Sequence, residues 1–325
     1  MIKTAEFVSP KHPDKICDFI ADSILDAYLA EDKNSRVAVE VMGGHKLITI
    51  NGEVTSHASP LLEKIVKEIV GEDFKIIINL SKQSPSIALG VDIGGAGDQG
   101  IMKGYATSDT ESMMPPEYEL ARDLCERVFE KYPYDGKVQV TLNNGEVETV
   151  VVSFQNTKNE ELLPLVKNII ETKKPQSLSS DGAQYLINPA GEWIQGGFDA
   201  DTGLSGRKLV IDNYGPEIPI GGGSFSGKDY TKVDRSGAYI ARKIAVDFIK
   251  SGKAKEVFVK LAYAIGKPEP VMAVAILDGV EIKINTQTEY NLTPKGIKNF
   301  LDLENVNFAE TSKWGHFGRN FNWDN

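Results

Sequence analysis

The sequence predicts an α+β fold made of three related units, each a β-sheet covered on one face by helices. A helix, two strands and a second helix recur along the chain with a period of about 110 residues. The helical segments are apolar at helical spacing, and the paired strands are joined by glycine-containing turns. Helices of this kind bury one side, and a sheet offers the surface for it. We place the units at residues 1–92, 93–192 and 193–325.

The elements follow one order in each unit. Pro13 suits the first position of a helix, and Gly43-Gly44 suits a turn between two strands. In the first unit we expect helix, strand, strand, helix and strand at residues 13–29, 36–42, 46–55, 60–70 and 74–80. The second unit repeats them at residues 116–132, 137–142, 147–155, 160–172 and 183–187. The third has a helix, two strands and a short helix at residues 233–251, 256–263, 271–276 and 294–301.

The composition excludes several classes of protein. Of the 325 residues 41% are hydrophobic and 25% charged, as in ordinary globular proteins. The net charge of −10 argues against a nucleic-acid binder, since affinity for the phosphate backbone depends on basic surface. No apolar run reaches the roughly 20 residues of a membrane span, and the N-terminus lacks the apolar core of a signal peptide. We therefore expect a cytoplasmic protein with no membrane partner, in which Cys17 and Cys125 are reduced core residues.

Each unit carries an acid in the first turn of its leading helix, at Asp14, Glu117 and Asp234. The helix dipole alone favours a carboxylate there. Asp14 and Asp234 have lysines nearby, whereas Glu117 has Met, Pro and Tyr for neighbours. We therefore expect a functional role in the first and third units, and a structural role in the second.

Residues 221–235 read GGGSFSGKDYTKVDR and hold the strongest functional signal. Glycines let the backbone approach a bulky anion, Lys228 and Lys232 neutralise phosphate, and a carboxylate near phosphate usually holds Mg²⁺. The segment is not a P-loop, because Asp229 stands where that motif has Ser or Thr, and Pro219 precedes the glycines. We interpret it as another kind of polyphosphate site; the alternative is a flexible turn before a helix.

Three further segments carry candidate residues. His12 lies among lysines and an aspartate, where it can carry a proton or donate to phosphate; the alternative is a helix N-cap. The glycine-rich segment 94–100 contains Asp98, an acid suited to an amine or an adenine N–H. The segment 201–208 adds an acid and two adjacent cations, which a solvated strand edge would also explain.

With these motifs in this order, the chain resembles the S-adenosylmethionine synthetase (methionine adenosyltransferase) family over nearly its whole length. The motifs that carry the resemblance are HPDK at 12–15, GAGDQG at 95–100, GGGSFSGKD at 221–229, KVDR at 232–235 and GHFGR at 315–319. The resemblance implies an enzyme in which the sulfur of L-methionine attacks C5′ of ATP, triphosphate leaves, and the triphosphate is then hydrolysed to phosphate and pyrophosphate. It also implies three domains that interleave along the chain, and a homodimer with its active sites at the subunit interface. Whether the dimers pair further is left open.

The resemblance further implies roles for individual residues. Asp14 and Asp234 would each hold one of two Mg²⁺ ions, and Glu40 would bind K⁺. The residues around the triphosphate, with roles in catalysis, would be His12, Lys137, Arg207, Lys208, Lys228 and Lys232. Those that bind methionine or the nucleoside would be Glu53, Gln83, Asp98, Asp201, Trp193 and Ile265, with Trp193 stacked on adenine.

This set of residues suits the implied reaction. Charge accumulates on the departing triphosphate, where Mg²⁺ and fixed cations stabilise it. A thioether sulfur has no proton to lose, so no Ser-His-Asp or Cys-His nucleophile is required. One alternative is a kinase or ATPase that uses residues 221–235 for γ-phosphoryl transfer. The other is a catalytically weak family member that acts as a regulatory subunit.

Two departures from the family pattern bear on substrate handling. Lys11 replaces the usual glycine before the HPDK motif, which puts a cation beside the expected triphosphate site. The loop between Gln83 and Asp98 is shorter than is general in the family. We expect residues 83–92 to form a shortened lid that selects methionine less strictly.

Overall fold

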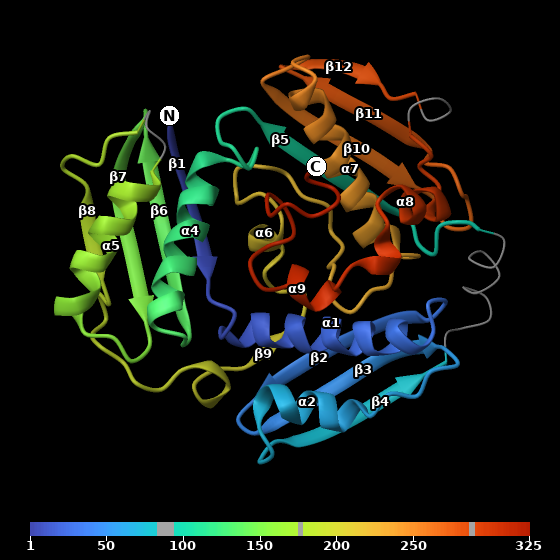
Figure 1. Ribbon diagram of the computed structural model, residues 1–325, viewed down its shortest axis with the longest axis horizontal. Helices are drawn as coiled ribbons and strands as arrows, with labels where there is room; N and C mark the ends of the chain where they lie inside the picture. Colours follow the sequence, from blue (N-terminus) through green and yellow to red (C-terminus); the bar gives the residue numbers. More distant parts are fainter. Residues whose placement is uncertain (83–93, 175–177, 286–289) are drawn as a thin grey trace.

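A computed structural model describes residues 1–82, 94–174, 178–285 and 290–325 of the chain (Figure 1). Three four-stranded sheets surround a common centre, in the strand orders β4-β3-β2-β9, β1-β6-β7-β8 and β12-β11-β10-β5. Helices lie on one face of each sheet, so the expected three-unit α+β fold is confirmed. In the described part of the chain, no helix is long and apolar enough to cross a membrane.

The first sheet is built from the N-terminal part of the chain. Val37, Val39 and Val41 are buried and alternate with more exposed residues, so one face of the sheet packs on helix α1. The elements are α1 (Pro13–Glu31), β2 (Arg36–Gly44), β3 (Leu47–Thr55), α2 (Leu62–Val70), β4 (Lys75–Ser81) and the short β9 (Gly203–Leu204).

The other two sheets repeat this plan. The second contains β1 (Ile2–Val8), β6 (Gly136–Asn143), β7 (Glu146–Phe154) and β8 (Gln184–Ile187), under helices α4 (Pro116–Lys131) and α5 (Asn159–Lys173). The third contains β5 (Gly100–Thr107), β10 (Glu256–Tyr263), β11 (Met272–Leu277) and β12 (Val280–Lys283), under helices α7 (Val233–Lys250) and α8 (Pro294–Phe300).

Each sheet takes one strand from a distant part of the chain. Strand β1 pairs with β6, β5 pairs with β10, and β9 pairs with β2. The sequence pattern did not predict these three strands, because their partners are remote and local periodicity carries no sign of them. It also missed β12, a short exposed strand that pairs with the adjacent β11. The exchange of strands ties the three units together.

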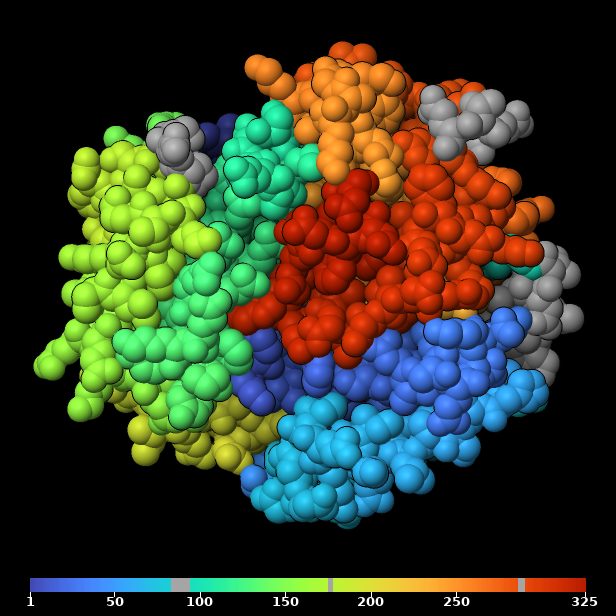
Figure 2. Space-filling model, in the orientation of Figure 1, coloured from blue at the N-terminus to red at the C-terminus, as the bar shows by residue number. Residues whose placement is uncertain are grey.

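The C-terminal segment fills the centre. It contains the short helix α9 (Phe308–Thr311) and, with α6 (Leu209–Asp212), lies between the three sheets (Figures 1 and 2). Trp323 is fully buried and stacks on Tyr239 of α7 at a centroid distance of 3.8 Å. Arg242, also on α7 and fully buried, donates from Nε to Asp324 (2.9 Å) and through its other nitrogens to three carbonyl groups of residues 105, 112 and 113.

The Arg242 contacts predict a large loss of stability when this side chain is removed. Arg242→Met leaves the Asp324 carboxylate buried without its cation, which typically costs about 3–5 kcal/mol. Lys243→Met is the matched control, because Lys243 forms a partly exposed ion pair with Asp247 on the same helix, and pairs in contact with solvent contribute about 0.2–1 kcal/mol. Urea unfolding of both variants checks this, and equal losses would contradict the assigned role of Arg242.

Candidate active site

The first group of candidate residues, the α1 group, surrounds the N-terminus of α1 and consists of His12, Asp14, Arg207 and Lys208. Asp14 is buried, its Oδ1 accepts a hydrogen bond from the N–H of Leu204 (2.9 Å), and its Oδ2 pairs with Lys208. Arg207 Nε lies 3.7 Å from Oδ1. Burial alone would raise the pKa of Asp14, but the bonds from Lys208 and Leu204 outweigh it and hold the pKa below its ordinary value.

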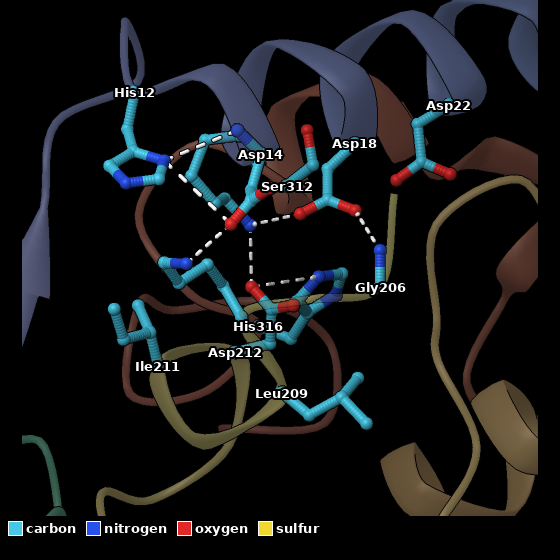
Figure 3. A network of polar contacts seen from close by, with 12 residues as sticks. His12, Asp14, Asp18, Asp22, Gly206, Leu209, Ile211, Asp212, Ser312 and His316 are labelled. Carbon is cyan, nitrogen blue, oxygen red and sulfur yellow. Dashed lines mark hydrogen bonds and ion pairs between the residues drawn. The ribbon is translucent and has the colours of Figure 1, made fainter. Parts of the chain in front are cut away.

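His12 is the N-cap of α1, and its Nδ1 accepts a hydrogen bond from the N–H of Asp14 (3.2 Å; Figure 3). Burial, together with the nearby cations Lys208 and Lys137, lowers the pKa of His12 to about 4. The ring is therefore neutral at pH 7, and the bond to Nδ1 assigns its proton to Nε2. A helix N-cap role and a functional role are compatible for His12. The N-cap contact uses Nδ1, and Nε2–H can still donate to an anion.

Lys137 and Asp201 belong beside the α1 group. Both act electrostatically on His12, Lys137 lowering and Asp201 raising its pKa. Lys137 lies on β6, and its Nζ is held 2.6 Å from a carboxylate oxygen of Glu6 on β1. The pairing of β1 with β6 thus sets the position of a candidate cation, and Glu6 is a contact that the sequence did not reveal.

The second group, the loop group, consists of Lys228, Lys232 and Asp234 at the junction of the glycine-rich segment and α7. Lys228 Nζ lies 2.7 Å from Asp234 Oδ2, and Lys232 pairs with Asp229. The lysine and aspartate side chains are between 14% and 18% exposed, except for the fully buried Asp229. They are fixed by neighbours yet open to a ligand.

A cavity of about 500 Å³ opens beside the loop group, within the range of small-molecule sites. Glu40, Asp98, Lys228 and Asp234 line it. Glu40 is exposed on β2, and its carboxylate accepts from the hydroxyl of Ser205 (3.3 Å). Of the described residues that line this cavity, none is His12, Asp14 or Lys137. The structure therefore sorts the predicted residues into two groups.

The segments that carry Asp98 and Ile265 are hydrogen-bonded to one another. The backbone of Ala96 exchanges two hydrogen bonds with the turn after β10: its N–H donates to Lys267 (2.9 Å) and its carbonyl accepts from Gly266 (2.8 Å). Ile265, in that turn, is 54% exposed. The glycine-rich segment around Asp98 is thus pinned to the end of β10.

The remaining predicted residues are less closely grouped. Glu53 is exposed near the end of β3, and Trp193 is half-buried in the segment that leads to Asp201. Gln83 and the expected lid at 83–92 lie outside the described residues. Lys11 lines a separate cavity of about 780 Å³ that contains no member of either group.

Sequence reasoning missed the acids that support both groups. Asp18 accepts a hydrogen bond from Gly206, beside Arg207, and Asp22 accepts one from Gly227, beside Lys228 (both 2.8 Å). The available signal was the spacing of four aspartates at every fourth position of α1, which places them on one side of the helix.

No three His, Cys, Asp or Glu side chains of the described residues gather closely enough to hold a metal by themselves. The described side chains therefore do not form a metal site made of protein ligands alone. Each group instead provides one carboxylate among cations, at Asp14 and at Asp234. This donor set suits Mg²⁺, which usually takes one or two carboxylates and completes its shell with phosphate oxygens and water.

Comparisons with known proteins agree along the whole chain. The N-terminal, central and C-terminal domains of S-adenosylmethionine synthetase match residues 1–85, 93–193 and 195–325. The S-adenosylmethionine synthase of Thermus thermophilus is 38% identical, over 99% of this chain and 95% of the relative. That of Mycoplasmopsis pulmonis is 40% identical, over 97% of the chain and 93% of the relative. A solved structure, described as an unusual S-adenosylmethionine synthetase from Campylobacter jejuni, is 33% identical with a TM-score of 0.90, covering 100% of this chain and 96% of that one.

The contact between Gly223 and Asp234 yields a test of the loop group. A Cβ on Gly223 would collide with the Asp234 carboxylate, whereas one on Gly222 meets nothing within 4 Å. A displacement near 1 Å at a reacting site can cost about 100-fold in rate. Gly223→Ala should therefore lose on the order of 100-fold in kcat, and Gly222→Ala far less. Steady-state assays of the two variants check this, and similar losses would show that the position of Asp234 does not matter.

Proposed function

The chain belongs to the S-adenosylmethionine synthetase family, and from that membership and its two residue groups we infer that it joins ATP and L-methionine into S-adenosylmethionine. The methionine sulfur donates a lone pair to C5′, and the C5′–O bond breaks with its electrons going to the triphosphate. Water then splits the triphosphate into phosphate and pyrophosphate. The observation that carries this proposal is the gathering of candidate cations and carboxylates into two groups, each with one acid among lysines or arginines.

The cations of the α1 group would bind the triphosphate. Arg207 and Lys208 carry fixed charge, and the neutral His12 donates through Nε2–H without losing a proton in the reaction. Lys137, held by Glu6, adds a further charge beside them. Fixed donors of this kind favour the transition state, because they do not have to reorganise as charge develops.

The loop group would complete the phosphate site. Lys228 and Lys232 would contact phosphate oxygens, and Asp14 and Asp234 would each hold one Mg²⁺ together with the phosphate. Bound Mg²⁺ supplies charge neutralisation on the leaving triphosphate. Glu40, exposed at the cavity beside Ser205, would bind K⁺. Asp98, Asp201, Trp193 and Ile265 would bind methionine and the nucleoside, as would Glu53 and Gln83.

We further propose a homodimer that builds each site from the α1 group of one subunit and the loop group of the other. Asp22 accepts the backbone hydrogen bond that holds the loop group to α1. It lies eight residues after Asp14, so the two groups are about 12 Å apart along the helix axis. The sheet faces turned away from the helices expose apolar side chains, including Met42 (44%) and Ile101 (53%), as expected of a surface that a second copy covers. A cytoplasmic location remains a prediction from the sequence.

Product analysis tests the reaction itself. With labelled methionine, ATP, Mg²⁺ and K⁺, chromatography should show a labelled sulfonium product together with phosphate and pyrophosphate. Removal of Mg²⁺ with EDTA should abolish it, since both carboxylates would lose their ion. Release of ADP in place of the sulfonium would instead identify a kinase or ATPase.

Asp234→Asn tests the metal role. The substitution keeps the shape of the side chain but removes the charge, so sulfonium formation should fall by on the order of 10² to 10³, as for the loss of one transition-state contact. The unfolding midpoint should change little, because a helix-dipole interaction contributes only about 0.3–1 kcal/mol.

The matched control is Glu117→Gln, in the first turn of α4 at the equivalent place of the second unit. Glu117 is buried and, among the described residues, one of its oxygens has no hydrogen-bond partner. Activity close to that of the unmodified protein is expected for this variant. Near-normal turnover in Asp234→Asn would show that its carboxylate serves only the helix.

A further inference from the structure

Four aspartates form a row along one side of helix α1, at Asp14, Asp18, Asp22 and Asp26. Each accepts a hydrogen bond from the backbone of another segment: Leu204, Gly206, Gly227, and Phe308 with Ala309, respectively, at 2.8–3.0 Å. Figure 3 shows the first three carboxylates along the helix, with Gly206 opposite Asp18. The row connects α1 to the segments that carry Arg207 with Lys208, and Lys228.

Three of these acids have a partner that explains their burial. Asp14 pairs with Lys208, and Asp22 with Arg235, whose two terminal nitrogens lie 2.7 and 2.9 Å from its oxygens. Asp26 is only partly buried and accepts two backbone N–H groups. Asp18 differs, because it is fully buried and its neighbour Lys15 already has another acid.

Lys15 is shared between two buried acids. Its ammonium donates to Asp212 Oδ1 at 2.5 Å and forms an ion pair with Asp18 Oδ2 at 3.1 Å, although that oxygen accepts no hydrogen bond. His316, whose Nε2 lies 4.0 Å from Asp212 Oδ1, is neutral, because burial and nearby cations hold its pKa well below the ordinary value. The cluster of Lys15, Asp18 and Asp212 therefore contains one carboxylate more than it has cations. An uncompensated buried acid is unfavourable, so Asp18 needs a different explanation.

Asp18, unlike Asp212, is the acceptor for the N–H of Gly206. Gly206 has a φ of +74°, in the left-handed region where a backbone bond is needed to select one conformation. The next two residues are Arg207 and Lys208, and the preceding Ser205 exchanges bonds with β2 through the N–H and carbonyl of Val41. The Asp18 bond is thus the last fixed point before the two cations.

We propose that Asp18 is a positioning residue for the reaction, which holds Gly206 so that Arg207 and Lys208 meet the triphosphate. It acts through the backbone and touches no substrate itself. The inference rests on the proposed function for the role of Arg207 and Lys208. The structural part of it is that two acids share Lys15, so that Lys15 keeps Asp212 as its partner when Asp18 is replaced.

The test compares substitutions at two positions of the row. Asp18→Ala removes the acceptor, and kcat should fall about 10- to 100-fold as Arg207 and Lys208 lose their position. The melting temperature should remain close to that of the unmodified protein, because an excess buried carboxylate is removed together with the hydrogen bond. Asp18→Asn keeps an oxygen for Gly206 and should recover most of the lost rate.

Asp26→Ala is the matched control. It removes a carboxylate from the same side of the same helix, but its partners, Phe308 and Ala309, belong to a segment with no member of either group. It should lower the melting temperature and leave kcat unchanged. If Asp18→Ala does not fold, Asp18→Leu, which fills the same space without an acceptor, replaces it with the same expectations.

A second readout separates positioning from general damage. Calorimetric titration with inorganic tripolyphosphate in Mg²⁺ should show weaker binding to Asp18→Ala than to Asp18→Asn and Asp26→Ala. A kcat of Asp18→Ala near that of the unmodified protein overturns the proposal, as does a loss of kcat that simply follows melting temperature across all variants. Should the unmodified protein form no sulfonium product, the proposed function fails, and tripolyphosphate binding still decides the role of Asp18.

Discussion

The structure depends on the burial of carboxylates where three sheets meet. A buried carboxylate is tolerated only when a cation or several N–H groups satisfy it. Asp22 is satisfied by Arg235 and Gly227, and Asp324 by Arg242 and two backbone N–H groups. The contacts with Arg235, Gly227 and Arg242 join segments far apart in the sequence, so the same contacts that satisfy the buried charge also hold the three units together.

The same contacts determine where the candidate site residues lie. Helix α1 anchors the α1 group at its N-terminus and, through Asp22, the loop group two turns later. The two groups are therefore fixed relative to one another by a single rigid element. The cavity at the loop group lacks the members of the α1 group, so under the proposed function one chain would provide two partial phosphate sites. A second copy of the chain would supply what each lacks.

The sequence predicted the local elements well and the long-range ones poorly. The helices α1, α4 and α7 begin where the repeat and the first-turn acids placed them, at Pro13, Pro116 and Val233. Strands β1 and β5 were missed, because their partners lie on other parts of the chain and a period of two says nothing about which strand will pair.

The candidate site residues show the same difference between local features, which the sequence reveals, and long-range contacts, which it does not. The glycines and lysines at 221–235 could be interpreted from the sequence as a phosphate-binding segment, since their chemistry is local. Asp18 could not be recognised from the sequence as a residue of interest, because an aspartate every four residues on a helix usually indicates a solvated face. Its role emerges only when Gly206, 188 residues away in the sequence, is found against it.

The central claim, that two chains share each site, is tested most directly by mixing two inactive variants. Asp14→Asn lacks a functional α1 group, and Lys228→Ala lacks a functional loop group. After verified subunit exchange, about half of the dimers are mixed, and each of these has one site with both groups intact. The account predicts that roughly a quarter of the unmodified activity returns. If both groups serve a site within one chain, every chain carries a lesion, and activity that stays at background after exchange would contradict the account.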